Sequence, residues 1–586
     1  MYDVLFINAH RHLGNASYEW QSCLGLMSMA AFLEKNGIEA RVFNCNYYDV
    51  MESFDSNDDL HCKVLGLYCD FDNVFEVINI SLWVKENWHI PVIVGGPQSK
   101  HLTKDFFLKS MCDVVVRGEG ELTIVDLVNF FLESTGSLEE IRGISYLRND
   151  EIVMNEDQAL IENLDVLPYC DEKYIVNKKK HNNFWVCMTG RGCPFSCSFC
   201  FEALSSKKVR FRSVTNVLVE LSNKFSAVST IKYLMFADDT FTLIPERVKK
   251  LCDGIIDIRK HKDFIWYCEG HVSTLLQHPE MIDYMVAAGM VRLQLGIESG
   301  NEHVLRAYNK GCTPDDIITL VKICKEKGVK SVYGNIILGS AFFTKKTFEC
   351  DLEFAQKLLE VSDGIVELAV IYYWPLPGTR MTNNPDTYGI KLEDTDFVTC
   401  MMDLPQTSTD EYTLWDIQGF GYKLNERLND TVLNMIRSGK ISRSRILDWY
   451  CIEKKYGSSI SIWHNLVKKY GEVDRYFVLL VDRNTVCESE VEDNSLLNLH
   501  PIRLVDLATQ FDGNKIVNVL FDCVELDAID LEVLRYSYGK LAVEEILSIL
   551  KEKFSCVFKD SRNAQKVILS KLRRLENFYF ISFGKY

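Results

Sequence analysis

The chain has 586 residues, of which 47% are hydrophobic and 25% are charged, and its formal net charge is −17. This length exceeds a single hydrophobic core and predicts several domains of an ordinary globular protein. The acidic balance argues against a general nucleic-acid binder, which needs basic surface to neutralise phosphates. The 20 cysteines form no regular framework, which excludes a disulfide scaffold and predicts buried thiols in a reducing cytoplasm.

The amino-terminal sequence predicts neither a signal peptide nor a membrane span. MYDVLFINAH has no basic segment ahead of its apolar run. The longest apolar stretch, about residues 23–33, is far shorter than the ~20 residues that span a bilayer. We therefore expect a cytoplasmic protein without a membrane partner.

Residues 1–150 alternate apolar runs with amphipathic patterns, which predicts a parallel, doubly wound domain of the flavodoxin or Rossmann type. The expected strands are residues 3–8, 39–44, 64–68, 91–94 and 113–117, and the expected helices are residues 22–36, 74–86 and 121–133. Ligands of such sheets bind beyond the carboxyl ends of the strands. The sequence places there Asn8, Ala9, His10, Tyr68, Gly95, Gly96, Pro97, Gly118, Glu119 and Gly120. The alternative interpretation is that the glycines only form tight strand–helix turns.

A polar connector at residues 151–183 leads to a second α/β series at residues 184–400. Its expected strands are residues 185–189, 231–237, 264–272, 291–297, 331–338 and 367–373. Its expected helices are residues 214–225, 247–258, 279–288, 315–327 and 344–359. This pattern predicts a doubly wound sheet or a partial (β/α)6 barrel of the TIM type, with function at the carboxyl ends of the strands in either case.

The carboxyl-terminal third has fewer chemical signals. Residues 401–495 form a charged helical extension. In residues 496–586, Asp512-Gly513 predicts a hairpin turn between strands at residues 502–510 and 515–521. Helices are expected at residues 528–536, 542–554 and 562–575, before a short apolar end. A hairpin followed by helices is typical of a winged-helix module, although it also describes an ordinary packing domain.

The stretch RGCPFSCSFCF contains three cysteines within eight residues, Cys193, Cys197 and Cys200. A structural zinc site normally takes four ligands, and the sequence has no second pair nearby. A redox pair would use Cys197 and Cys200 and would leave Cys193 unexplained. Three thiolates on a 4Fe–4S cluster leave one iron open to a small molecule, so the spacing favours a cluster.

With Phe199 before the last cysteine, this spacing resembles the signature of the radical S-adenosylmethionine (SAM) enzymes. The resemblance implies that the three cysteines hold a 4Fe–4S cluster whose open iron chelates SAM. It also implies that an electron donor such as flavodoxin or ferredoxin reduces the cluster, which cleaves SAM to a 5′-deoxyadenosyl radical. Motifs at later strand ends follow the family's order, among them Lys310-Gly311, and the implied SAM contacts are Phe199, Asp238, Asp239, Glu298, Ser299 and Asn335. For Asp238 and Asp239, a helix N-cap is the alternative.

The first domain is similar to the cobalamin-binding domain of the cobalamin-dependent branch of this family. The similarity rests on GGP at residues 95–97, RGEGE at residues 117–121 and LGL at residues 24–26. The Asp-x-His-x-x-Gly motif that supplies a lower histidine ligand is missing, as it commonly is in this branch. The similarity implies that the ten strand-end residues named above contact cobalamin. The alternative is a domain that has lost cobalamin.

Together these resemblances imply a cobalamin-dependent C-methyltransferase. In such enzymes one SAM methylates cobalt, and another gives the radical that removes hydrogen from the unactivated carbon to be methylated. Residues 531–580 resemble the PqqD-like domains that recognise leader peptides by strand addition, so the expected substrate is a ribosomally made peptide rather than a lipid or pigment, with a small-molecule substrate as the alternative. The alternatives are a peptide maturase that cross-links, forms rings or epimerises without methyl transfer, and a non-catalytic peptide carrier with a structural metal. No catalytic base is assigned; Tyr267, Glu269, His271 and Tyr308 lie at strand ends.

Overall fold

The computed structural model describes residues 1–10, 23–56, 60–177, 183–205, 207–393, 404–483, 493–558 and 560–584. These residues belong to two compact units. The first comprises Met1–Val329, Tyr333–Phe354 and Leu368–Leu424, and the second comprises Lys330–Val332, Ala355–Glu367 and Asn425–Tyr586. Within the described ranges, no helix has both the length and the apolar character needed to cross a membrane.

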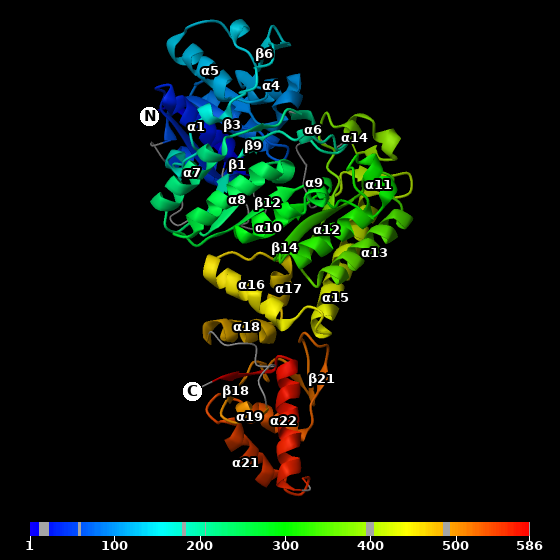
Figure 1. Ribbon diagram of the computed structural model, residues 1–586. Coiled ribbons are helices and arrows are strands. Elements are labelled where there is room, and N and C mark those ends of the chain that lie inside the picture. Colours follow the sequence, from blue (N-terminus) through cyan, green and yellow to red (C-terminus); the bar gives the residue numbers. More distant parts are fainter. Residues whose placement is uncertain are drawn as a thin grey trace. The chain divides into compact units, whose positions relative to one another are not determined.

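The first unit begins with a seven-stranded sheet in the order β2-β1-β3-β4-β5-β6-β7. Its residues are coloured from blue to cyan in Figure 1. Its strands are β1 (Tyr2–His10), β2 (Ala40–Asn46), β3 (Cys62–Tyr68), β4 (Val92–Gly95), β5 (Val114–Val116), β6 (Ile144–Arg148) and β7 (Glu151–Met154). Its helices are α1 (Leu24–Lys35), α2 (Tyr47–Ser56), α3 (Val74–Asn87), α4 (Lys104–Ser110) and α5 (Glu121–Glu133). Strands β1 to β5 are parallel and their order reverses between β1 and β3, which is the switch point where ligands bind in such sheets. The predicted doubly wound sheet is confirmed, whereas α2, α4 and the antiparallel pair β6–β7 were not expected.

Both faces of this sheet are buried. Alternate side chains of a strand point to opposite faces. Leu5 and Ile7 of β1 enter a core shared with α2, α3 and α4. Val4 and Phe6 enter a second core shared with α1 and α5. A strand buried on both faces reads as a continuous apolar run, and this is why β1 could be identified in the sequence.

The second sheet has the order β15-β14-β13-β12-β11-β8, which follows the chain without a reversal. Its strands are β8 (Phe184–Cys187), β11 (Tyr233–Phe236), β12 (Ile265–Gly270), β13 (Met290–Leu295), β14 (Ser331–Leu338) and β15 (Val366–Tyr372). The intervening helices are α7 (Val214–Ala227), α8 (Pro245–Arg259), α9 (Val272–Gln277), α10 (Glu280–Ala287), α11 (Glu302–Ala307), α12 (Pro314–Glu326) and α13 (Lys345–Ser362). A sequential parallel order favours the partial barrel over the doubly wound alternative. All the strands and helices expected in this region are present.

The chain continues into a helical region and a small mixed module. The helices are α14 (Arg380–Asn383), α15 (Leu414–Arg437), α16 (Arg443–Tyr456), α17 (Ile462–Lys468), α18 (Gly471–Arg483), α19 (Asp493–Leu496), α20 (Ala528–Tyr536), α21 (Val543–Lys553) and α22 (Ser561–Asn577). The strands are β16 (Lys391–Leu392), β17 (Thr407–Ser408), β18 (His500–Arg503), β19 (Phe511–Asp512), β20 (Lys515–Ile516), β21 (Val524–Glu525) and β22 (Ile581–Gly584). The module has its own apolar core, formed by residues from α19 to β22.

The hairpin turn in this module is confirmed, because Phe511 pairs with Ile516 across Asp512-Gly513. The long strands expected on either side are wrong. Val505 and Val519 are buried in the module's core without belonging to a strand, so their apolar character reflects packing and not strand pairing. The apolar end of the chain forms β22, which pairs with β18. The winged-helix assignment stays a prediction.

Candidate functional site

The three cysteines of the motif lie on the loop that follows β8 and the short strand β9 (Gly190–Arg191). All three are half-buried, and none of the described cysteines forms a disulfide. The backbone N–H of Ser198 donates to the carbonyl of Tyr308 at 3.0 Å, and that of Met381 donates to the carbonyl of Ser198 at 3.0 Å. The loop is therefore fixed at its middle by the end of α11 and the start of α14.

The cysteine side chains share a loop but are not gathered around one point. Among the described residues, no three His, Cys, Asp or Glu side chains are arranged to hold a metal ion. The donor set itself suits an iron–sulfur cluster, because soft thiolates are the usual ligands of such clusters. The thiols are also half-exposed at the carboxyl end of the barrel, where a cluster would be open to a second ligand.

Carboxyl groups follow three neighbouring barrel strands at this edge. Asp239 follows β11, Glu269 lies at the end of β12, and Glu298 follows β13. Burial, with the nearby Glu202 and Asp238, raises the pKa of Asp239 to about 7. Burial, with the charges of Asp239 and Glu298, raises the pKa of Glu269 to about 7. The carboxyl groups of Asp239 and Glu269 therefore keep protons near neutral pH. A cationic group bound at this edge would stabilise their ionised forms.

Lys310 brings a positive charge to the same edge. Its Nζ lies 3.2 Å from Glu298 Oε1, and the two side chains are 7% and 10% exposed. Burial works to lower the pKa of Lys310, but the Glu298 carboxylate outweighs it, so the pKa is raised. Sequence reasoning placed Lys310 in a motif but missed this pair, because nothing in the spacing of the two residues shows that they meet.

Glu298 has an unusual backbone conformation, with φ at 61°. This left-handed region is rare for residues with a side chain. It is held by two backbone hydrogen bonds to β14, one from Glu298 N–H to the Asn335 carbonyl at 2.8 Å and one from Ile337 N–H to the Glu298 carbonyl at 2.9 Å. Strain of this kind clusters at functional sites.

Two side chains at this edge carry polar atoms without a hydrogen-bond partner among the described residues. His271, which is 7% exposed, has no partner for either ring nitrogen, and Asn335 has none for Oδ1. The His271 ring stacks on Phe195 of the cysteine loop, with centroids 3.6 Å apart. Burial and the charge of Lys310 lower the pKa of His271 to about 4, so its imidazole is neutral. Native proteins rarely leave such atoms unpaired, so they indicate positions that a bound molecule would complete.

Asp238 has a structural role at the start of the loop. Its carboxylate accepts hydrogen bonds from the N–H and the hydroxyl of Thr189 and from the N–H of Gly190. The N-cap alternative for Asp238 and Asp239 is wrong, because the helical segments that follow begin after Thr240 and Ile244. The carboxylate oxygens of Asp238 already accept hydrogen bonds from the loop after β8. Its contact with SAM stays a prediction.

The other expected SAM contacts lie at the same edge in different surroundings. Ser299 is buried and donates to Asp351 Oδ1 at 2.6 Å, which ties the end of β13 to α13. Phe199 meets Tyr308 edge-on with ring centroids 4.9 Å apart. Of the strand-end tyrosines, Tyr308 bonds Ser340 and Tyr267 bonds the sulfur of a methionine, so both are occupied by packing.

The residues expected to contact cobalamin lie together at the carboxyl ends of β1, β3, β4 and β5: Asn8, Ala9, His10, Tyr68, Gly95, Gly96, Pro97, Gly118, Glu119 and Gly120. Polar groups here largely pair with one another. Asn44 Oδ1 accepts from Asn8 Nδ2 at 3.0 Å and lies 2.6 Å from His10 Nε2. Burial lowers the pKa of His10 and raises that of Asp70. Both shifts favour the neutral forms.

Two glycines at this edge have a positive φ. Gly96 has φ at 119°, and a Cβ there would lie 2.5 Å from the carbonyl oxygen of Cys69. Gly118 has φ at 81°, and its Cβ position faces open space. Gln98, beside them, is 3% exposed, and its Oε1 has no hydrogen-bond partner in the described part of the chain. The tight-turn interpretation accounts for the positive φ of both Gly96 and Gly118, and the contact of these residues with cobalamin stays a prediction.

Four charged residues join this edge to the barrel; we name Glu119, Glu121, Arg191 and Arg210 the clamp. Arg210 donates to Glu119 at 2.5 and 3.0 Å, and Arg191 donates to Glu121 Oε1 at 2.6 Å. The side chains of Arg210 and Glu121 are 3% and 4% exposed. Glu119, expected to contact cobalamin, is thus held by an ion pair. Sequence reasoning missed the clamp, which fixes the β5–α5 loop beside the start of the cysteine motif.

Aromatic side chains complete the contact between this edge and the cysteine loop. Phe71, which follows β3, meets Phe201 with ring centroids 5.0 Å apart and Trp374 at 6.1 Å. His101, which follows β4, lies 6.3 Å from the Phe201 ring. The carboxyl edge of the first sheet therefore faces the cysteine loop of the barrel.

Comparison with known proteins gives a consistent result. Residues 188–350 match the radical SAM superfamily. The chain is 33% identical over 325 residues to an uncharacterized methyltransferase of Pyrococcus horikoshii. The aligned region covers 54% of this chain and 68% of that protein. The radical SAM methyltransferase TsrM from Kitasatospora setae, solved with cobalamin and a 4Fe–4S cluster, has a TM-score of 0.53 at 17% identity, covering 68% of this chain and 81% of TsrM. The cobalamin-dependent radical enzyme OxsB, solved with aqua-cobalamin, has a TM-score of 0.56 at 15% identity, covering 99% of this chain and 85% of OxsB. At these identities the two structures show the fold.

Proposed function

The chain belongs to the radical SAM superfamily, and on that premise we propose that it is a cobalamin-dependent enzyme that methylates an unactivated carbon of a ribosomally made peptide. One observation carries the proposal. The glycine-rich edge of the first sheet faces the cysteine loop through Phe71 and Phe201, so a ligand on that edge would lie beside a cluster on the loop. The cobalamin found in two structures of similar fold supports the same cofactor here.

When bound, the cluster with SAM would supply an organic radical, and cobalamin would supply a methyl group. The chain's own task is to hold and orient these groups and to exclude water. We assign the cluster to Cys193, Cys197 and Cys200, whose half-exposed thiols share one fixed loop.

We assign SAM to the barrel edge beside this loop. Asp239 and Glu269 can lose their protons to water and pair as carboxylates with a bound cation, and Lys310 offers a positive charge to a carboxylate. The neutral His271 and Asn335 Oδ1 offer unused hydrogen-bonding groups. A zwitterion with an added positive charge suits this mixture of groups.

The peptide substrate is supported by the organisation of the carboxyl-terminal residues. Those from α19 to β22 form a separate core, and no strand end or cysteine motif of the proposed chemistry lies in it. A module with its own core, attached to a radical enzyme, suits substrate docking. Its PqqD-like character rests on the sequence resemblance.

Product analysis tests the function. The reconstituted, cobalamin-loaded protein is supplied anaerobically with a reductant and with SAM whose methyl group is deuterated. Methyl transfer predicts S-adenosylhomocysteine together with 5′-deoxyadenosine, and a peptide substrate that gains a deuterated methyl group. 5′-Deoxyadenosine alone would favour a maturase without methyl transfer. Formation of neither product would contradict a radical enzyme.

A further inference from the structure

A buried carboxylate of α13, Asp351, contacts the segment that follows β13. This segment consists of residues 298–301, and we name it the β13 turn. Asp351 is 4% exposed, and its Oδ1 accepts hydrogen bonds from the Ser299 hydroxyl and from the Gly300 N–H, both at 2.6 Å. Burial raises the pKa of Asp351 to about 6, so the carboxylate is ionised at neutral pH. A buried negative charge is therefore placed directly against the β13 turn.

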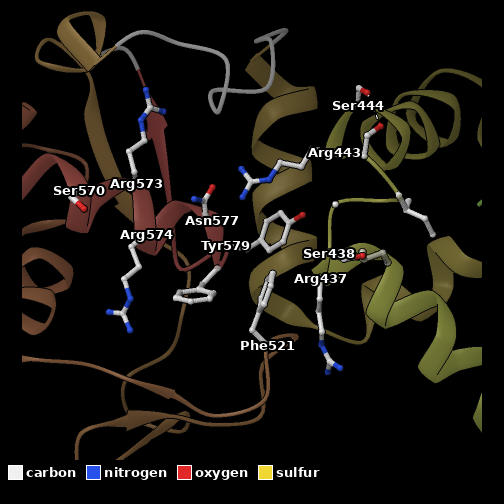
Figure 2. A pocket seen from close by; sticks show the side chains of 15 residues that line it. Arg437, Ser438, Arg443, Ser444, Phe521, Ser570, Arg573, Arg574, Asn577 and Tyr579 are labelled. Carbon is white, nitrogen blue, oxygen red and sulfur yellow. Dashed lines mark hydrogen bonds between the residues drawn. The ribbon is translucent and has the colours of Figure 1, made fainter. Parts of the chain in front are cut away.

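No cation pairs with Asp351 among the residues that the structure describes. Buried carboxylates of the second unit show the usual arrangement, in which an arginine compensates the charge. Glu576 lies 3.1 Å from Arg443, and Asp530 lies 2.6 Å from Arg574. Figure 2 shows both arginines in the wall of a cavity. A carboxylate without a counter-charge is costly to bury, so Asp351 depends on the hydrogen bonds that the β13 turn donates.

The β13 turn is held from two sides. On the β14 side, the Glu298 N–H donates to the Asn335 carbonyl at 2.8 Å. On the α13 side, Gly300 packs so closely that a Cβ at this position would clash with the Cβ of Phe354. Asp351 accepts its two hydrogen bonds on this second side. Together these contacts support the left-handed backbone of Glu298, which residues with a side chain rarely adopt.

The direction of the Glu298 side chain follows from this backbone. Its Oε1 lies 3.2 Å from Lys310 Nζ. The pair lies over Gly296, where a Cβ would collide with Lys310 Nζ. Gly296 thus makes the room that the pair occupies. A different backbone conformation at Glu298 would turn the Cα–Cβ bond and move the carboxylate away from Lys310.

We propose that Asp351 is a positioning residue for SAM binding: through Ser299 and Gly300 it fixes the β13 turn, which directs Glu298 into the barrel edge. Asp351 acts through the turn and needs no contact of its own with the ligand. The inference rests on the SAM site of the proposed function. It does not depend on cobalamin, on methyl transfer or on a peptide substrate.

Binding of SAM to the reconstituted, unreduced protein tests this inference by isothermal titration calorimetry. Asp351→Ala removes both acceptor oxygens, so the Kd for SAM should rise by about tenfold or more while the 4Fe–4S absorption is preserved. In anaerobic assays of 5′-deoxyadenosine formation, the KM for SAM should rise by a similar factor, with kcat unchanged within about twofold. The matched control is Glu349→Ala, also on α13, whose side chain is 56% exposed. This control should bind SAM like the unchanged protein.

A milder variant covers the case in which Asp351→Ala does not fold. Asp351→Asn keeps the shape of the side chain and one acceptor oxygen but loses the charge. Hydrogen bonds to a neutral acceptor are weaker, so its Kd for SAM should rise by about threefold. A Kd of Asp351→Asn equal to that of the unchanged protein would overturn the inference. A loss of cluster and kcat in equal proportion, with the Kd for SAM unchanged, would indicate a merely structural role and would also overturn it.

Two further results test the route through the β13 turn. Gly300→Ala displaces the turn from α13 without changing Asp351, and it should weaken SAM binding by about tenfold. In a protein that already carries Glu298→Gln, adding Asp351→Ala should raise the Kd by less than about threefold, because both changes remove the same contact. Fully additive effects, or unchanged binding in Gly300→Ala, would contradict a role through Glu298.

The same measurements separate a failure of this inference from a failure of the proposed function. An unchanged protein that neither binds nor cleaves SAM contradicts the proposed function, and the positioning role with it. An unchanged protein that binds and cleaves SAM, with the same Kd in Asp351→Ala, contradicts the positioning role alone.

Discussion

The parallel strands of the first sheet and those of the barrel end on edges of different chemistry. At the barrel edge, Asp239 and Glu269 have a pKa raised to about 7, Lys310 is buried, and the two ring nitrogens of His271 have no hydrogen-bond partner among the described residues. At the edge of the first sheet, polar side chains mostly pair with one another, and Gly96 and Gly118 have a positive φ. Under the proposed function, the barrel edge takes a charged ligand that side chains bind, and the edge of the first sheet takes a large ligand that backbone approaches.

The clamp links these edges. Charges in the clamp balance, with two carboxylates facing two guanidinium groups in a largely buried setting. Removing one member of such a pair leaves an uncompensated buried charge, which costs more than the pair contributes. The clamp therefore holds the edges in a fixed relation.

The largest effect is expected from removing one cysteine of the loop at the barrel edge. Cys200→Ala removes one thiolate ligand, so the reconstituted protein should lose most of its 4Fe–4S absorption, and SAM cleavage should fall by about three orders of magnitude. The same change at the exposed Cys451, in the second unit, is the matched control and should leave both unchanged. Cleavage that survives in Cys200→Ala would contradict the cluster assignment.

The next largest effect is expected from a substitution that alters only the edge of the first sheet. Gly96→Ala places a Cβ 2.5 Å from the Cys69 carbonyl and strains a backbone with φ at 119°, at a cost of about 1–3 kcal/mol. Cobalamin retained after desalting should fall by about tenfold while cluster absorption is preserved. Gly419→Ala, where a Cβ meets open space, is the control. Equal cobalamin retention in the two variants would place the cofactor elsewhere.

A smaller effect loosens the clamp between the edges. Arg210→Gln leaves Glu119 without its main partner, so SAM cleavage should continue while methyl groups transferred per SAM cleaved fall by about tenfold. Adding Glu119→Gln removes the unpaired charge and should recover part of the thermal stability but not the transfer ratio. A parallel fall in cleavage and transfer would indicate a general folding defect and contradict the positioning role.

The smallest effect concerns protons at the barrel edge. Because the folded pKa of Glu269 is raised to about 7, the folded state keeps a proton that the unfolded state releases near pH 4. The free energy of unfolding should therefore fall as pH rises from about 4 to about 7, by up to about 1.4 kcal/mol per pH unit from this group. The free energy of unfolding is measured by chemical denaturation at each pH. It should fall less steeply with rising pH in Glu269→Gln than in the unchanged protein, whereas the variant of the exposed Glu302, Glu302→Gln, should show the unchanged pH dependence. Identical slopes would contradict the shift.

The sequence predicted the elements whose pattern is local. β1 is buried on both faces, so its sequence is one apolar run. The three cysteines could be identified from their spacing alone. The two sheets could not be told apart in type from the strand pattern, since both alternate strands and helices. Only the strand order, which depends on long-range pairing, separates the switch-point sheet from the partial barrel.

Long-range pairs were beyond sequence reasoning. Arg210 and Glu119 are 91 residues apart, and neither stands in a pattern that names its partner. The conformation of Glu298 is imposed by backbone bonds to β14, so the residue could be chosen as a SAM contact without its strain being foreseen. In the carboxyl-terminal module, Val519 looked like strand because burial by packing and burial in a sheet give the same apolar signal.

The central claim is that cobalamin is held on the first sheet opposite a cluster on the cysteine loop. Electron paramagnetic resonance of the protein with bound cobalamin in its Co(II) state and a reduced cluster tests this most directly, because two nearby paramagnets broaden or split each other's signals. The account predicts a coupled spectrum that becomes the cluster signal alone in Gly96→Ala. A spectrum equal to the sum of two isolated signals, with cobalamin fully bound, would contradict it.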